Sequence, residues 1–205
     1  MLLAIDTSAG TSVAVVDRDR GVLAEYSEPD TRKHAEVIGT FIAASLHDAG
    51  VTVAHLNGVA VGMGPGPFTG LRVGIAAARA FAFGASLPVL PVVSHDAIAF
   101  GTVQPLLVVT DARRREVYWS AYVGSDAEGL PIVASGPGLV RPDDLAATVP
   151  GFAGYRRFDA EVVSAASVGL LAERLLLHDR PFAGPHALYL RAPDITPSAA
   201  PKRVS

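Results

Sequence analysis

The hydrophobic periodicity of the chain changes along the first half in an order that strongly limits the possible folds. Three short apolar runs joined by tight turns come first, and a helix, a strand, a second helix and a further strand follow. Gly50 follows the first helical pattern, at the position where glycine commonly ends a helix. The expected strands are 2–6, 11–16, 22–26, 59–62 and 88–93, and the expected helices are 34–49 and 69–84.

The second half repeats the order βββαβα, although its residues do not visibly repeat. The expected strands are 106–110, 117–123, 132–135 and 151–158, and the expected helices are 142–149 and 162–178. Mixed strands with helices covering the sheet faces are typical of the α/β class. We therefore predict an N-terminal lobe, residues 1–100, and a C-terminal lobe, residues 101–191. A flexible tail rich in Pro, Ala and Ser, residues 192–205, is expected to follow.

Composition and charge argue against several classes of protein. The formal net charge is −3, whereas a protein whose main task is to grip phosphates carries an excess of Lys and Arg. The dense basic runs, 113–115 and 156–157, are interpreted as solvated turns or strand ends. Without cysteine, the chain can form no disulfide, Cys-type zinc site or thiolate nucleophile. Gly and Pro interrupt its charge-free stretches, and its start lacks the basic region of a signal peptide, so we expect a cytoplasmic protein without a membrane span.

Two loops carry residue types that could approach a phosphate or a metal ion. Residues 6–8 end the first strand, and their short polar side chains either contact a ligand or bond to N–H groups of their own turn. The glycines of 64–69 allow close backbone approach, and Thr69 is expected to cap the following helix, whose N-terminus favours anions. The loop lacks the Lys and Ser/Thr of a P-loop, so a rigid connection is the alternative. The candidate nucleotide-binding residues are Asp6, Thr7, Ser8, Gly64 and Gly66.

The helix expected over 69–84 is apolar almost all the way round. Only Arg72 and Arg79 are charged, and most other positions hold Gly, Ala or a large hydrophobic residue. A helix of this pattern must be covered on nearly every side, and its small residues would let another helix approach closely. Either the helix is central in the fold or a second chain covers part of it. We favour a subunit interface.

The residue patterns of hydrolases and metalloenzymes are missing from the sequence. No two of the six histidines are four residues apart, so no HxxxH or HExxH pair exists on a helix. There is no GxSxG nucleophile motif. Asp143 and Asp144 stand at an expected helix start, where carboxylates complement the helix dipole. The sequence therefore predicts no catalytic residue and no metal site.

Four segments resemble the TsaB (YeaZ) family: 6–8 (Asp-Thr-Ser), 34–36 (His-Ala-Glu), the glycine-rich 64–74, and 189–191 (Tyr-Leu-Arg). The resemblance spans nearly the whole chain, and the glycine-rich segment is its most specific part. Pro67 departs from the family, which usually has Ser there. The resemblance implies an actin-like (ASKHA, ribonuclease-H-like) α/β fold of duplicated βββαβα units. It also implies a role in making N6-threonylcarbamoyladenosine at position 37 of tRNAs that read codons starting with A.

The resemblance further implies a non-catalytic subunit. In the related TsaD subunit an HxxxH pair after the fifth strand helps to hold the catalytic metal. Here His95 fills the first position, and Ala99, which cannot ligate a metal, fills the second. The expected partners are TsaD, bound through the helices 34–49 and 69–84, and the ATPase TsaE. The same surface is expected to form a homodimer when the chain is alone. The expected interface residues are His34, Ile38, Phe41, Thr69, Gly70, Arg72, Val73, Gly74, Ala77, Ala78 and Phe81.

No cofactor is expected to be required, and ATP or ADP is expected to bind weakly and only in the complex. The charge balance predicts that tRNA is contacted at most indirectly. The alternative is an autonomous nucleotide-dependent ATPase or small-molecule kinase of the actin-like fold, which predicts ATP turnover that is lost in Asp6→Ala. A metalloprotease is a third reading, and the missing histidine pair argues against it.

Overall fold

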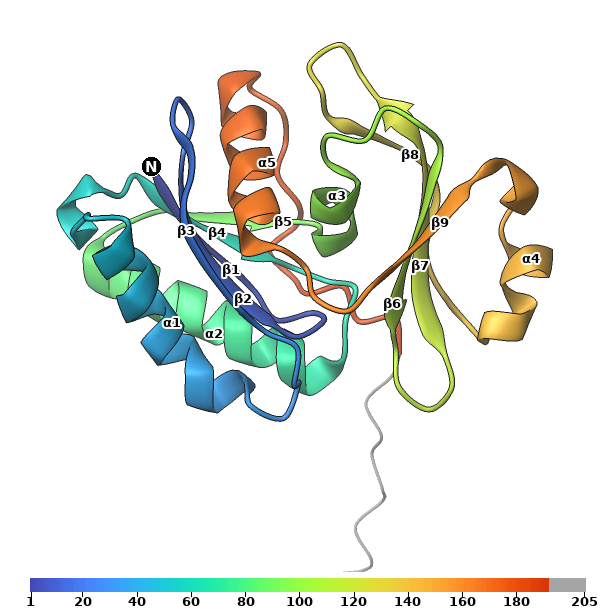
Figure 1. The fold of residues 1–205 in the computed structure, drawn as a ribbon, viewed down its shortest axis with the longest axis horizontal. Coiled ribbons are helices and arrows are strands. Elements are labelled where there is room, and N and C mark those ends of the chain that lie inside the picture. Colours follow the sequence, from blue (N-terminus) through green and yellow to red (C-terminus); the bar gives the residue numbers. More distant parts are fainter. Residues whose placement is uncertain (192–205) are drawn as a thin grey trace, which may run out of the picture.

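Two β-sheets stand side by side in the computed structural model, which describes residues 1–191 (Figure 1). The predicted tail, 192–205, lies outside the described residues. The first sheet has the order β3-β2-β1-β4-β5, and the second has the order β8-β7-β6-β9. The strands are β1 (Leu2–Asp6), β2 (Thr11–Asp17), β3 (Gly21–Glu28), β4 (Gly58–Gly62), β5 (Val89–Val92), β6 (Leu106–Asp111), β7 (Val117–Ser125), β8 (Pro131–Val140) and β9 (Arg156–Ala160).

Both sheets are built on the same plan. In the first, β1 pairs antiparallel with β2 and parallel with β4. In the second, β6 pairs antiparallel with β7 and parallel with β9. The first strand of each half is therefore central in its sheet, as the repeated order βββαβα predicts. This arrangement confirms the predicted α/β class and the duplicated architecture.

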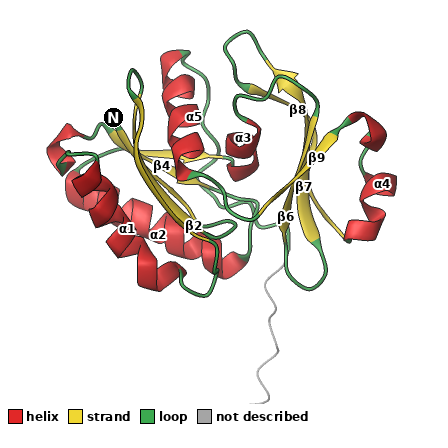
Figure 2. Cartoon of the chain, in the orientation of Figure 1, coloured by secondary structure: helices red, strands yellow, loops and turns green. Residues whose placement is uncertain are grey.

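Helices cover the first sheet on both faces (Figure 2). One face carries α1 (His34–Asp48) and α2 (Phe68–Ala85), and the other carries α5 (Ala165–Leu177). Alternation along β1 explains this arrangement, because successive side chains point to opposite faces of a strand. Leu3 and Ile5 pack in the core beneath α1 and α2. Leu2 and Ala4 pack in the core beneath α5.

The second sheet is covered by shorter elements. On one face α3 (Ser94–Ala99) packs against β6 and β7, and on the other face Leu145 of α4 (Leu145–Thr148) packs among β6 and β7 residues. The short 3-10 turns are η1 (Val53–His55), η2 (Pro142–Asp144) and η3 (Phe152–Gly154). Thus α5, from the second half of the chain, covers the first sheet, whereas α3, from the first half, covers the second (Figure 1).

The structure corrects several element boundaries. The helix expected over 142–149 is split into η2 and one turn of α4, and the strand expected over 151–158 is η3 followed by β9. Gly151, at φ 70°, provides the bend between α4 and η3. The prediction that Thr69 caps α2 was wrong, because the helix begins one residue earlier and its N-cap is Pro67, which has no side-chain oxygen. Within residues 1–191, no helix has the length and apolar character needed to cross a membrane.

Candidate functional site

The carboxylate of Asp6 is directed into the protein, not toward solvent. The residue is 1% exposed. Its Oδ1 accepts hydrogen bonds from the Ser8 backbone N–H (2.7 Å) and the Ser8 hydroxyl (2.6 Å), and its Oδ2 accepts one from the Ser94 hydroxyl (2.6 Å). The Ser94 Oγ in turn accepts from the Gly64 N–H at 2.9 Å. Asp6 therefore links the end of β1 to the glycine-rich loop and to the start of α3.

Burial changes the acidity of this carboxyl group. Desolvation raises the pKa of Asp6 from 3.8 to about 6, although the hydrogen bonds from Ser8 and Ser94 act in the opposite direction. A Cβ at Gly62 would lie 1.7 Å from Asp6 Oδ2, so β4 approaches the carboxylate as closely as its backbone allows. Both carboxylate oxygens of Asp6 accept hydrogen bonds, and the backbone of β4 lies against them. The carboxylate therefore faces the protein interior.

The hydroxyl of Thr7 is inserted into α2. It donates to the Gly70 carbonyl (2.7 Å) and accepts from the Gly74 N–H (3.1 Å). These two groups are four residues apart, the pair that an α-helix would join to each other. A Cβ at Gly74 would lie 2.2 Å from Thr7 Oγ1, and one at Gly70 would lie 2.6 Å from the Thr7 carbonyl oxygen. The two glycines therefore allow α2 to pack directly on the end of β1.

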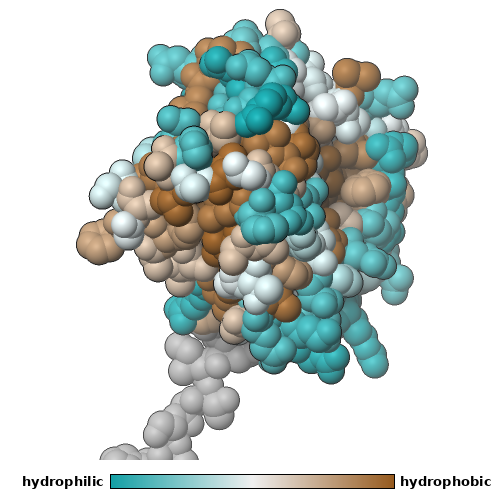
Figure 3. All heavy atoms as spheres, turned by 60° about the vertical axis from the view of Figure 1, so that its left-hand side comes forward, coloured by the Kyte–Doolittle hydropathy of each residue, from teal (hydrophilic) through white to brown (hydrophobic). Residues whose placement is uncertain are grey.

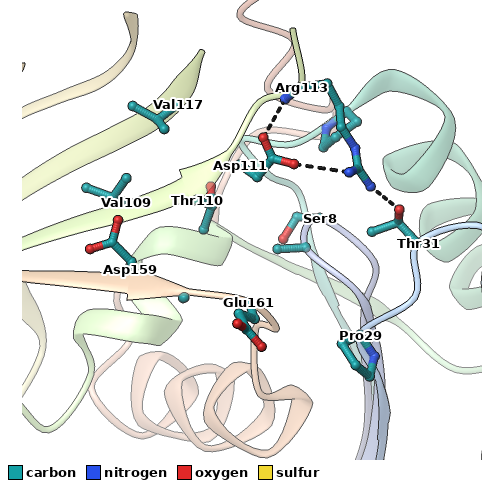
Figure 4. Close-up of a pocket in the computed structure, with 13 residues that line it drawn as sticks. Ser8, Pro29, Thr31, Val109, Thr110, Asp111, Arg113, Val117, Asp159 and Glu161 are labelled. Carbon is teal, nitrogen blue, oxygen red and sulfur yellow. Dashed lines mark hydrogen bonds and ion pairs between the residues drawn. The ribbon is translucent and has the colours of Figure 1, made fainter. Parts of the chain in front are cut away.

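A cleft of about 480 Å³ opens between the two sheets (Figure 4). Pro29 and Thr31 line it from the β3–α1 loop, and Asp111 and Arg113 line it from the end of β6 and the turn after it. Arg113 donates its backbone N–H to Asp111 (2.8 Å), and its guanidinium pairs with the same carboxylate at 3.1 Å. The guanidinium also donates to the Thr31 hydroxyl, which joins the second half of the chain to the loop before α1.

Carboxylates outnumber cations around this cleft. Asp111, Asp159 and Glu161 line it together with one cation, Arg113. Like charges repel, so three carboxylates oppose the entry of a polyphosphate. Among the five candidate nucleotide-binding residues, only Ser8 lines the cleft. The other four are Asp6, Thr7, Gly64 and Gly66, which are all buried. Nucleotide binding through these five residues stays a prediction.

The turn between β6 and β7 holds three consecutive arginines in the left-handed region. The φ angles of Arg113, Arg114 and Arg115 are 64°, 53° and 62°, and all three residues are exposed. Residues other than glycine occupy this region at a cost of about 1–3 kcal/mol each. The expectation of a solvated turn for this run is confirmed, whereas its left-handed backbone could not be predicted from the residue types.

His95, where the resemblance places the first histidine of the HxxxH pair of TsaD, is fully buried in the chain. Its Nδ1 lies 2.8 Å from the Ser120 Oγ, and its Nε2 lies 2.9 Å from the Thr110 Oγ1. Burial lowers the pKa of His95 from 6.5 to about 3, so the ring is neutral at pH 7. Residues 1–191 contain no group of three or more His, Cys, Asp or Glu side chains placed to hold a metal ion.

The expected interface residues divide into buried and accessible sets. Five are buried inside the chain: His34, Ile38, Gly70, Gly74 and Ala78. Of these, His34 is held by a contact of 2.7 Å between its Nδ1 and the Thr11 Oγ1. Four are half-buried, namely Phe41, Val73, Ala77 and Phe81, and two are exposed, Thr69 and Arg72. The expected interface thus mixes side chains that hold α1 and α2 on the sheet with side chains that a partner could reach.

The exposed side of α2 combines small and apolar residues with two arginines. Its exposed residues are Thr69, Arg72, Ala76, Arg79, Ala80, Phe83 and Gly84, and we call Thr69, Arg72, Ala76, Ala80 and Phe83 the outer face of α2. Phe83 is 90% exposed, the highest value among the exposed large hydrophobic residues of the described chain. Phe83 is not among the interface residues expected from the sequence, although its spacing of three and seven residues from Ala80 and Ala76 places it on the same side of the helix. Hydrophobic residues gather on the side of the molecule that Figure 3 turns forward, with hydrophilic residues around them.

Three comparisons place this fold among known proteins. A family model described as "TsaD: tRNA N6-adenosine threonylcarbamoyltransferase" matches residues 13–146. A Mycobacterium tuberculosis relative, "Uncharacterized protein Rv3421c", is 41% identical, and the alignment covers 97% of this chain and 95% of the relative. The Escherichia coli "tRNA threonylcarbamoyladenosine biosynthesis protein TsaB" is 35% identical over 59% of this chain and 54% of its own length.

A solved structure has the same architecture over its whole length. "YeaZ from Pseudomonas aeruginosa" superposes with a TM-score of 0.72 and 25% identity, covering 92% of this chain and 99% of that one. The Haemophilus influenzae protein named TsaB is 38% identical over 60% of this chain and 53% of its own length. Together with the glycine-rich segment and the duplicated sheets, these matches show that the chain belongs to the TsaB (YeaZ) family.

Proposed function

We propose that this chain is a non-catalytic subunit in the biosynthesis of N6-threonylcarbamoyladenosine in tRNA. In this proposal it binds a TsaD-type catalytic subunit, a TsaE-type ATPase joins the assembly, and the chain forms a homodimer when alone. The names of the E. coli and H. influenzae relatives and the match to the TsaD family model support the role in this pathway. In this proposal the chain acts in the cytoplasm. It contacts tRNA at most indirectly.

The observation that carries the proposal is the outer face of α2. An aromatic side chain that is 90% exposed, on the same side of α2 as the exposed Ala76 and Ala80, leaves apolar surface in water that a partner would remove. Alanines at positions 76 and 80 let the backbone of a second helix come close, and Phe83 supplies an anchor of the kind that dominates interface energetics. Beside it, α1 exposes the small residues Gly39, Thr40 and Ala43 on the same side of the sheet.

The chemistry of the interior supports a non-catalytic role. The carboxylate of Asp6 is engaged by Ser8 and Ser94, and both ring nitrogens of His95 contact hydroxyl groups of β6 and β7. A general base must reach the proton that it abstracts, and a metal ligand must have a free lone pair. Neither side chain meets these conditions in this arrangement. Binding to the catalytic subunit is therefore the contribution that we assign to the chain.

A reconstitution with matched variants tests the proposal. The TsaD-type and TsaE-type subunits are assayed for tRNA modification with the native chain, with Phe83→Asp and with Val103→Asp. Val103 is 79% exposed on the loop before β6, so it controls for adding a charge to an exposed apolar position. We expect Phe83→Asp to weaken binding of the TsaD-type subunit at least tenfold and to lower modification, whereas Val103→Asp has no effect. Full modification without the chain, or equal behaviour of the two variants, would refute the proposal.

The cleft keeps an autonomous nucleotide-dependent ATPase or kinase as a second candidate, because its volume of about 480 Å³ is that of a small-ligand site. This candidate predicts ATP turnover by the purified chain that depends on Ser8, the one candidate nucleotide-binding residue in the cleft, and on Arg113, the cation that lines it. We expect no turnover above the background of a Ser8→Ala, Arg113→Ala double variant. Turnover that the double variant abolishes would favour the enzyme over the subunit.

A further inference from the structure

A groove of about 620 Å³ runs along α2, next to its outer face. One wall is formed by α2 with Arg72, Ile75, Ala76 and Arg79. The other wall is the segment 185–189 near the end of the described chain, which we call the strap. Ala76 belongs both to this groove and to the outer face of α2, so the two surfaces are continuous.

The strap is held in place by contacts to both the first sheet and α2. Just before it, the Ala183 N–H donates to the Pro91 carbonyl (3.0 Å), and within it the Leu188 N–H donates to the Met63 carbonyl (2.8 Å). The Arg79 guanidinium donates to the Pro185 carbonyl at 2.6 Å. These bonds join backbone separated by many residues, so the groove has two fixed walls.

The two arginines of the groove have no acidic partner. Within residues 1–191 neither guanidinium lies within ion-pair distance of a carboxylate, and no Asp or Glu lines the groove. Arg72 instead lies over the Phe68 ring, 3.6 Å from its centroid, and the Phe68 and Tyr189 ring centroids are 4.9 Å apart. Stacking fixes a guanidinium while leaving its N–H groups free for a bidentate acceptor.

From this geometry we propose that the groove binds an acidic, extended segment of the TsaD-type partner, with Arg72 and Arg79 each receiving a carboxylate. This inference rests on the proposed function. Two arginines seven residues apart on a helix are separated by about 10 Å along its axis. A chain in the extended polyproline II conformation spans about 9 Å in three residues, at about 3.1 Å per residue, and its side chains return to the same face at every third residue. The segment would therefore carry acidic residues three positions apart.

The apolar residues of the two walls indicate which kind of side chain would lie between those carboxylates. Ile75, Ala76 and Ala187 are apolar and would accept an apolar side chain from the same segment. A nucleic acid, with a charge on every phosphate, matches two arginines and these apolar residues less well, and the net charge of the chain is −3. The apolar outer face of α2 would contribute most of the buried area, and the groove would set the orientation of the partner.

Affinity measured against salt concentration tests this inference on the full chain. The double variant Arg72→Glu, Arg79→Glu is compared with Arg156→Glu in binding to the TsaD-type subunit. Arg156 is a matched control because it is exposed and also lies near a phenylalanine ring, 5.9 Å from the Phe158 centroid on the second sheet. We expect the native chain and the control to lose affinity as salt rises, because salt screens ion pairs. The double variant is expected to bind at least tenfold more weakly at low salt and to gain affinity as salt rises, because salt then screens repulsion between like charges.

The outcomes separate this inference from the proposed function. If Phe83→Asp abolishes binding while the double Glu variant matches Arg156→Glu, the groove proposal fails and the proposed function stands. If neither variant changes binding, both fail. The double variant Arg72→Lys, Arg79→Lys keeps both positive charges and is expected to retain the salt dependence. If the affinity of this variant did not depend on salt, the inference would be contradicted. If the double Glu variant lost affinity for tRNA but not for the TsaD-type subunit, the groove would be assigned to RNA and the inference would be overturned.

Discussion

Asp6 and His95 are both buried titratable residues, and burial moves their pKa values in opposite directions. Desolvation raises the pKa of the Asp6 carboxyl to about 6 and lowers the pKa of the His95 imidazole to about 3. The folded chain thus holds a proton on Asp6 more tightly than the unfolded chain does, and holds one on His95 less tightly. Stability follows pH according to the difference in bound protons between the two states, so each residue leaves a separate signature.

The first prediction concerns Asp6→Asn. The Asp6 contribution to stability is fully present below its ordinary pKa of 3.8 and is lost as pH rises through about 6. Lowering the pH from 7 to 4 should therefore favour the native chain over the variant, by up to about 1.4 kcal/mol per pH unit in that window. Urea unfolding of both proteins at pH 7, 6, 5 and 4 measures this difference. A difference in stability that does not change with pH would show that Asp6 is solvated.

The second prediction, for His95→Gln, has the opposite sign. Because the pKa of His95 is lowered from 6.5 to about 3, the unfolded chain takes up the proton first as pH falls. The neutral ring therefore contributes stability above pH 6.5 that is lost progressively toward pH 3. The stability advantage of the native chain over His95→Gln should shrink as the pH is lowered, by up to about 1.4 kcal/mol per pH unit. The same urea series checks this, and an advantage that grows on acidification would contradict it.

At the scale of elements, α2 depends on its contact with β1. The Thr7 hydroxyl bridges the Gly70 carbonyl and the Gly74 N–H, so the helix and the strand end are joined by hydrogen bonds where a larger residue could not fit. The sequence shows these glycines as part of a small, apolar helix. Only the position of β1 shows that Gly70 and Gly74 allow close packing inside the chain.

The third prediction compares two glycine substitutions in α2. Gly74→Ala would place a Cβ 2.2 Å from Thr7 Oγ1, so the helix must shift, and we expect a loss of about 1–3 kcal/mol in the free energy of unfolding. In Gly84→Ala the added Cβ would meet no atom within 4 Å apart from its chain neighbours and the backbone of its own helix, and the variant should gain about 0.5–1 kcal/mol, because alanine lowers the entropy of the unfolded chain. Chemical denaturation measures both. Equal stabilities for the two variants would mean that α2 does not pack on Thr7.

At the scale of the whole molecule, the two sheets are joined by an exchange of helices. α5 packs on β1 and β2 of the first sheet, and α3 packs on β6 and β7 of the second. A Cβ at Gly169 of α5 would lie 2.6 Å from Val16 Cγ2, so this helix approaches the first sheet very closely. The strap then returns to β4 and β5, which adds a further connection from the end of the described chain to its first half.

The fourth prediction follows from this exchange. Trp119, the single tryptophan of the chain, lies on β7 of the second sheet and is 6% exposed, so its fluorescence reports on that sheet. Far-UV circular dichroism reports on both halves. Because each sheet is covered by a helix from the other half, we expect the two signals to give the same urea midpoint and slope. Two separated transitions would show that the halves unfold independently.

The sequence predicts the order of the elements, the α/β class and the apolar character of α2, because periodicity and residue identity are local properties. The inward direction of Asp6, the exposure of Phe83 and the groove between α2 and the strap could not be predicted from it. Each depends on contacts between residues far apart in the chain, such as Asp6 with Ser94 or Arg79 with Pro185. A local pattern indicates that a side chain needs a partner, and only the tertiary structure decides which partner it has and which side of a helix remains exposed.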